Sequence, residues 1–178
     1  MSKHLIFEFY ICFGFRAWNF VLIYMDKLKQ IIRSKPRWVV LLIFSYILIL
    51  GVLRWRLTPD ITTVYYLVGG LFGVFFMDFA DVVFDIHPSP FRSIIFILLF
   101  GVVSFFIVTS SGSMFAIGLV LSLYFTLFLL QAEEWQEFKN LNSWYTLVKE
   151  APSVKMQQWI VLGTALLLVI ETLIFIRS

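Results

Sequence analysis

Long apolar runs dominate the pattern of this chain, and short polar segments separate them. The longest extends from Ser93 to Ala132, forty residues without a charged side chain, and a Ser-Ser-Gly-Ser turn at 110–113 interrupts it. A helix needs about 20 apolar residues to cross the hydrocarbon core of a bilayer. The run therefore predicts two membrane-spanning helices joined by a tight turn, near 93–109 and 114–131.

Three further apolar segments, near 38–55, 61–79 and 157–176, complete the predicted bundle. These runs are apolar on all sides, whereas the strands of a membrane β-barrel alternate apolar and polar residues. We therefore predict an all-α integral membrane protein with a bundle of five transmembrane helices. Four tryptophans are predicted to anchor the bundle at the membrane interfaces, as aromatic residues commonly do: Trp38, Trp55, Trp135 and Trp144.

The polar segment 132–156 is the largest connection between the predicted spans. Its apolar side chains share about 140° of a helical surface, which is typical of an amphipathic helix lying on a membrane. They are Trp135, Phe138, Leu141, Tyr145 and Val148. We predict such an interfacial helix within 132–156, with a surface for a partner protein as the alternative.

Residues 1–24 do not fit the bundle, because Glu8, Arg16 and Asn19 interrupt an otherwise aromatic-rich segment. We interpret 1–24 as an interfacial or poorly ordered segment. Two alternatives are a sixth span and an upstream start that is not native, since Met25 begins an ordinary cytoplasmic sequence for a membrane protein. Residues 25–178 are then the single transmembrane domain.

Lysine and arginine are distributed unevenly between the two sides of the predicted bundle. With a first span that starts in the cytoplasm, nine of these residues after Met25 are cytoplasmic and three are external. Because cytoplasmic segments carry an excess of Lys and Arg, we predict a cytoplasmic amino side and an external carboxyl terminus in the cytoplasmic membrane. The cytoplasmic set is Lys27, Lys29, Arg33, Lys35, Arg37, Arg92, Lys139, Lys149 and Lys155, and the external set is Arg54, Arg56 and Arg177.

Composition supports a membrane protein and narrows the chemistry. Apolar residues make up 61% of the chain and charged residues 14%, against about 25% charged residues in soluble domains. The lone cysteine, Cys12, excludes an intrachain disulfide and a cysteine-based zinc site. The basic cluster at 27–37 is interpreted as a topology signal and a contact for anionic lipids, not for nucleic acid.

Asp78, Asp81 and Asp85 form the most specific polar pattern, at the end of the second predicted span. On a continuing helix the three lie within roughly 60° of one another. One interpretation is that they are simply the wetted end of that span. The other is a Mg²⁺ site, because Mg²⁺ prefers carboxylate oxygens and keeps waters that a diphosphate can replace. Its further ligands would be the acidic residues at the same end of the fourth span: Glu133, Glu134 and Glu137.

The segment from Met77 to Asp85 resembles the acidic motif of intramembrane aromatic prenyltransferases, Asn-Asp-x-x-Asp-x-x-x-Asp. Those enzymes bind a diphosphate through Mg²⁺, so the resemblance implies a Mg²⁺-dependent enzyme acting on a lipid or isoprenoid diphosphate at the cytoplasmic face. Met77 replaces the asparagine of the motif, and the match covers nine residues. The second aspartate-rich motif of that family is absent, and the chain is shorter than its larger bundle.

Two other patterns lie inside predicted spans. Glu171 is the one ionisable residue clearly within a span. We expect it to face the bundle and a Ser, Thr or Tyr partner, with a role in proton or cation coupling as the alternative. Small residues four positions apart permit close helix packing within the bundle or between subunits. They are Gly69, Gly73, Gly118 and Ser122.

Few intramembrane polar groups are available for chemistry, and this scarcity decides the functional prediction. We expect a non-catalytic accessory, scaffold or assembly subunit without a cofactor, whose partners are the bilayer and another membrane protein or a second copy. The alternatives are the Mg²⁺-dependent enzyme and an oligomeric pore or carrier lined by Glu171.

Overall fold

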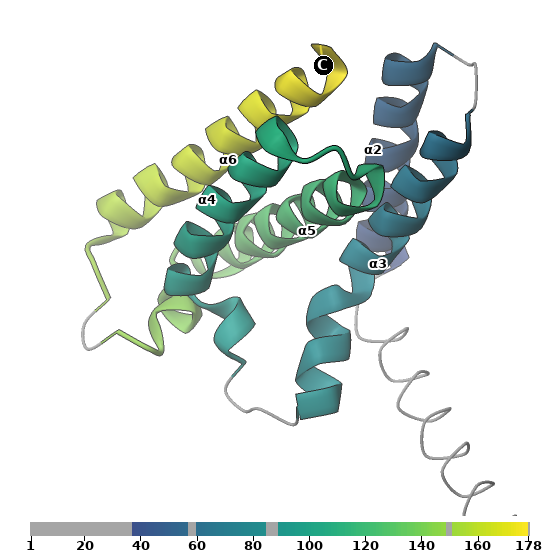
Figure 1. Cartoon of the computed structure of the whole chain (residues 1–178). Coiled ribbons are helices and arrows are strands. Elements are labelled where there is room, and N and C mark those ends of the chain that lie inside the picture. The colour runs from purple at the N-terminus through teal and green to yellow at the C-terminus, as the bar shows by residue number, and fades with distance from the viewer. Residues whose placement is uncertain (1–36, 57–59, 85–88, 149–150, 178) are drawn as a thin grey trace, which may run out of the picture. The chain divides into compact units, whose positions relative to one another are not determined.

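Five α-helices and two short 3₁₀ helices form the part of the chain that this computed structural model describes, residues 37–56, 60–84, 89–148 and 151–177 (Figure 1). Four of the α-helices are long and apolar enough to cross a membrane, and α4 is a shorter apolar helix. The prediction of a helical membrane bundle is confirmed. In chain order the elements are α2 (Arg37–Trp55), α3 (Ile61–Phe84), η1 (Pro90–Arg92), α4 (Ile94–Ser110), α5 (Met114–Phe138), η2 (Asn142–Tyr145) and α6 (Val154–Arg177).

Serine residues set the start of the two central helices. The Ser93 hydroxyl accepts the Phe96 N–H at 3.2 Å, and the Ser113 hydroxyl accepts the Ala116 N–H at 3.3 Å. These bonds satisfy backbone donors that have no partner within the first turn of a helix. The uncharged forty-residue run therefore folds as a hairpin of two helices that turns at 110–113, as predicted.

Small residues bring α3 and α5 into backbone contact. A Cβ atom added to Gly69 would collide with the carbonyl oxygen of Phe115, and one added to Gly73 would collide with the Ser122 hydroxyl. Gly118 lies at the same contact. Because these contacts advance in the same direction along both helices, α3 and α5 run parallel. The four small residues singled out in the sequence all lie at this one crossing inside the bundle.

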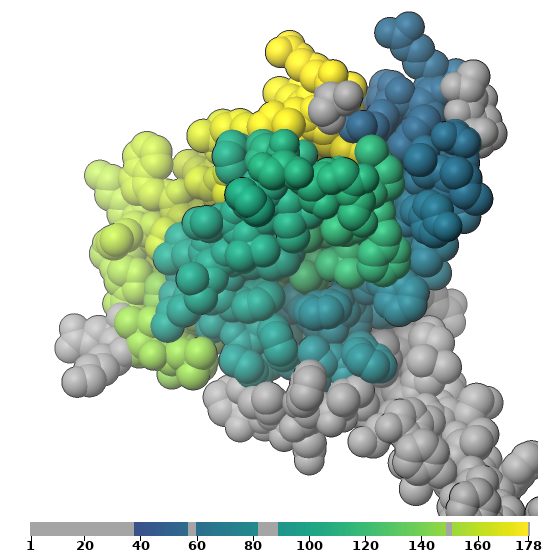
Figure 2. All heavy atoms as spheres, in the orientation of Figure 1, coloured from purple at the N-terminus to yellow at the C-terminus, as the bar shows by residue number. Residues whose placement is uncertain are grey.

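Helix α5 is the most enclosed of the four candidate spans and contacts α2, α3, α4 and α6. In the candidate membrane-spanning segment of α5, 56% is buried, against 28% in that of α2 and 22% in that of α6. Helices α4 and α6 adjoin on one face of the bundle (Figure 2). Helices α2 and α6 therefore expose long apolar surfaces, whereas α5 supplies most of the core.

The segment 132–156 differs from the prediction. Residues 132–138 continue α5, and the short helix η2 follows. Among the described residues of this segment, no separate amphipathic helix forms. Gln157 explains the difference, because its side-chain oxygen accepts the Leu141 N–H at 2.7 Å and its amide donates to the Pro152 carbonyl at 3.0 Å. The loop is thereby tied to α6.

Trp144 also corrects a prediction, because it is not an exposed interfacial anchor. Its side chain is 2% exposed and packs in a core cluster with Met77, Leu127 and Leu141. The loop folds back over the end of the bundle, so the indole fills space between helices. Trp38 is exposed and Trp135 is half-buried.

The opposite end of the bundle is closed by aromatic contacts. The Trp55 ring lies 5.5 Å from that of Tyr66 and 6.1 Å from that of Phe175. The Arg54 guanidinium lies 4.5 Å from the centre of the Phe175 ring and donates to the Phe175 carbonyl. Residues 36–178 form one compact unit, and the predicted segment 1–24 lies outside the described residues.

Candidate functional site

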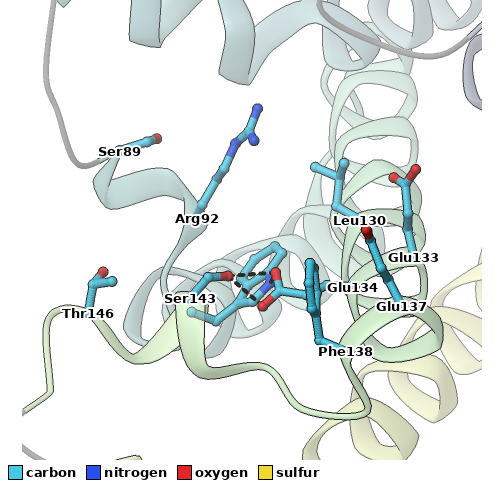
Figure 3. A pocket seen from close by; sticks show the side chains of 10 residues that line it. Ser89, Arg92, Leu130, Glu133, Glu134, Glu137, Phe138, Ser143 and Thr146 are labelled. Carbon is cyan, nitrogen blue, oxygen red and sulfur yellow. Dashed lines mark hydrogen bonds between the residues drawn. The ribbon is translucent and has the colours of Figure 1, made fainter.

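A cavity of about 430 Å³ opens at the end of the bundle where α5 ends and α4 begins (Figure 3). The last turns of α5 form one wall, and the segment before α4 and the helix η2 form the others. One guanidinium and three carboxylates are among the groups that line it. The lining residues are Ser89, Arg92, Leu130, Glu133, Glu134, Glu137, Phe138, Ser143, Trp144 and Thr146.

Glu134 is held in place by η2. The Ser143 hydroxyl donates to its carboxylate at 2.6 Å, and the Trp144 indole N–H donates at 2.8 Å. Glu133 and Glu137 stand four residues apart on α5 and therefore share a face of that helix. Figure 3 shows Arg92, the last residue of η1, on the other side of the cavity from Glu133 and Glu137. The cavity therefore carries opposite charges on opposing walls.

Asp78 and Arg92 form an ion pair that joins α3 to the short helix η1. The Asp78 carboxylate lies 3.6 Å from the Arg92 guanidinium, and Asp78 is 4% exposed whereas Arg92 is 49% exposed. The interpretation of Asp78 as the wetted end of a span is therefore wrong. Asp81 is half-buried and accepts a hydrogen bond from the Ser89 hydroxyl, and Asp85 lies outside the described residues.

Among the described residues, the predicted Mg²⁺ ligands do not lie together in one group. Within 37–56, 60–84, 89–148 and 151–177, no three His, Cys, Asp or Glu side chains are placed to hold a metal ion. Asp78 faces a guanidinium, and Glu134 is committed to Ser143 and Trp144. The charge of this end is thus balanced in part by Arg92, which the magnesium interpretation did not include.

Glu171 faces the interior of the bundle from α6. Its side chain is fully buried, and the Ser104 hydroxyl of α4 donates to Oε1 at 2.7 Å. Oε2 is buried and has no hydrogen-bond partner among the described residues. One position further along α6, Thr172 shares a hydrogen bond with the Tyr46 hydroxyl of α2. Two adjacent residues of α6 therefore bond to two different helices.

An apolar groove of about 490 Å³ lies between α4 and α6. Gly101 of α4 and Gly163 of α6 line it, together with Tyr124 of α5. A Cβ atom added to Gly163 would meet nothing within 4 Å, so the groove has spare room at that point. The interface of α4 and α6 is therefore looser than that of α3 and α5.

Arg92 is a residue of the candidate site that the sequence analysis did not single out, because it was counted only as a topology signal. It is the first cation after the aspartate row, and that proximity could have indicated the pair. Gln131 was missed as well. It is fully buried, and neither amide atom has a hydrogen-bond partner in the described part of the chain. The Tyr145 hydroxyl is similarly buried, and burial raises the pKa of the Tyr145 phenol.

No protein-family model, curated protein or solved structure matches this chain. Its function is therefore inferred from the residues and contacts of the bundle.

Proposed function

We propose that this chain is a non-catalytic subunit of the cytoplasmic membrane, which assembles with another membrane protein or with a second copy. One observation carries the proposal: three acidic side chains that are suited to chemistry instead join elements of the bundle. Asp78 pairs with Arg92, Glu134 accepts from η2, and Glu171 accepts from Ser104. Such contacts specify how helices pack, because few other polar partners exist in a membrane interior.

The outward surfaces of α2 and α6 support assembly. Leu48 of α2 is 53% exposed and Leu166 of α6 is 63% exposed. In both helices, less than a third of the candidate membrane-spanning segment is buried. A membrane helix associates through van der Waals packing and polar contacts, since lipid tails are as apolar as leucine. These faces contact lipid or another helix.

The orientation within the membrane is part of the proposal. The excess of Lys and Arg supports an orientation with the amino side and the Glu133 cavity in the cytoplasm and the carboxyl terminus outside. Reporter fusions after Ser111 and Ser178 should behave as external, and a fusion after Pro90 should behave as cytoplasmic. A cytoplasmic reporter at Ser178 would contradict the five-span topology.

In-membrane crosslinking tests the assembly. We would place a photo-crosslinking residue at Leu166 of α6 or at Leu48 of α2, and at Val102 of α4 as a third lipid-facing position (72% exposed). The expected result is one discrete protein adduct at α6 or α2, at a fixed ratio to the chain in mild detergent. Adducts with lipid alone at all three positions would contradict an assembly role.

Glu171 favours an oligomeric pore or carrier as a second candidate. Its Oε2 atom is buried without a hydrogen-bond partner in the described part of the bundle, and intramembrane carboxyl groups frequently mark ion or proton pathways. Ion flux in liposomes that the Glu171→Gln variant abolishes would support this candidate. Flux no greater than in empty liposomes would exclude it.

A further inference from the structure

The cavity at the end of α5 differs from a simple acidic cluster, because a guanidinium and three carboxylates line the same open cavity. We propose that it binds a phosphoethanolamine group, the headgroup of phosphatidylethanolamine. In this arrangement the phosphate lies beside Arg92 and the primary ammonium lies among Glu133, Glu134 and Glu137. The proposal goes beyond the assembly role and does not depend on it.

The carboxylate wall fits a primary ammonium. Glu133, Glu134 and Glu137 lie on adjoining turns of α5 and all line the cavity. An ammonium carries three N–H donors, and each carboxylate offers about four acceptor positions. Glu134 already accepts from Ser143 and Trp144, so its orientation is set before a ligand arrives and it keeps capacity for another bond.

The guanidinium wall fits a phosphate. Arg92 is half exposed and contacts Asp78 through one terminal nitrogen. A guanidinium has five N–H donors in a fixed plane and binds phosphate oxygens in pairs. The buried Asp78 carboxylate lies beside the Arg92 side chain, whose remaining donors have no other partner among the described residues. The hydroxyl of Thr146 lies in the same cavity.

Gln131 is a further polar residue of α5 near this end of the bundle, although it does not line the cavity. It lies three residues before Glu134 on α5, so the two share a face of the helix with Gln131 one turn deeper. Its amide is fully buried and has no hydrogen-bond partner among the described residues. Buried polar groups in native structures nearly always have a partner.

The place of the cavity indicates a lipid as the source of the headgroup. The cavity lies where the apolar helices α4 and α5 reach their polar ends, the level at which lipid headgroups surround a membrane protein. Three carboxylates against one guanidinium disfavour an anionic headgroup. An ammonium with hydrogens can donate to carboxylates, whereas the methylated ammonium of phosphatidylcholine cannot.

Native mass spectrometry of the delipidated full chain tests the proposal directly. We would add phosphatidylethanolamine, phosphatidylcholine or phosphatidylglycerol with identical acyl chains, each at several concentrations. We expect phosphatidylethanolamine to bind about tenfold more tightly than either other lipid, as charge-assisted hydrogen bonds would provide. Equal binding of all three lipids, or preferred binding of phosphatidylglycerol, would overturn the proposal.

Soluble O-phosphoethanolamine separates the two sources of the group. If it competes with the lipid, the headgroup alone is sufficient, and if only the lipid binds, the site is a lipid site. Both results support the assignment of the headgroup. Binding of neither, or binding of magnesium ion in the cavity with no effect of either amine, would refute it.

The Glu133→Gln/Glu137→Gln double variant tests the carboxylate wall. Neither residue hydrogen-bonds to another described residue, so the variant should fold. We expect its preference for phosphatidylethanolamine to fall about tenfold. The control is Gln136→Glu, which adds a carboxylate on the exposed side of α5 outside the cavity and should bind as the parent chain does. An unchanged preference in the double variant would contradict the assigned wall.

Discussion

Helices α3 and α5 meet backbone to backbone, whereas α4 and α6 meet through side chains that leave a groove. At the first contact, a Cβ atom added to Gly118 would collide with the carbonyl oxygen of Tyr66. At the second, Gly163 faces open space, and a hydrogen bond from Ser104 to Glu171 joins the helices. The same bundle therefore contains one helix contact stabilised by close packing, that of α3 and α5, and one stabilised by a hydrogen bond, that of α4 and α6.

This difference follows from the physics of association in lipid. No hydrophobic gain drives apolar helices together there, so stability comes from close packing or from hydrogen bonds. A contact held by packing is sensitive to one added methyl group. A contact held by a hydrogen bond is sensitive to the loss of its donor, and it tolerates added volume where space remains. Four single substitutions separate these cases.

The largest effect is expected for Gly118→Ala. The added methyl group has backbone on the other side, which cannot move aside as a side chain would, so α3 and α5 must separate. We expect the free energy of unfolding to fall by about 3 kcal/mol. Steric trapping in detergent micelles would measure it. A decrease in the free energy of unfolding below about 1 kcal/mol would show that α3 and α5 can accommodate the added methyl group.

Ser104→Ala should have the next largest effect, because it removes the donor to a buried carboxyl group. Leaving a buried polar group without its partner costs about 2 kcal/mol. A double-mutant cycle with Glu171→Leu, which removes the acceptor, isolates the pair, and we expect a coupling free energy above about 0.5 kcal/mol between the two sites. Additive effects would mean that the bond contributes nothing to the α4–α6 contact.

Gly101→Ala should cost about 1 kcal/mol or less. Its added Cβ would lie 3.1 Å from a terminal methyl of Leu167 and 3.5 Å from the Tyr124 hydroxyl. The far end of a leucine side chain can shift by a few tenths of an ångström, so the strain is small. The same unfolding assay applies, and a loss as large as that of Gly118→Ala would remove the distinction between the two contacts.

Gly163→Ala is the matched control and should change stability least. Nothing lies within 4 Å of the added Cβ, and alanine costs less backbone entropy than glycine in a helix. We expect a change within about 0.5 kcal/mol, or a slight gain. A clear loss would indicate that another helix, from a partner or a second copy, occupies the groove beside Gly163.

The sequence by itself determined the helices and much of the α3–α5 contact. A forty-residue uncharged run can satisfy its backbone in lipid only as helices, and the serines at 110–113 can start a new one, so the hairpin follows from local chemistry. The spacing of Gly69 and Gly73 likewise marks a face for close approach, because residues four apart lie on one side of any helix.

Only the tertiary structure decided what faces those surfaces. The aspartate row predicts a common face but not its neighbour, and Arg92 of the following helix turned out to neutralise Asp78. The pattern at 132–156 fits an amphipathic helix, yet the loop folds inward, where the Leu141 N–H donates to Gln157 and Trp144 is buried. The spacing of residues in the sequence indicates on which side of its own helix a side chain lies. Its partner depends on how distant segments pack, which no local pattern contains.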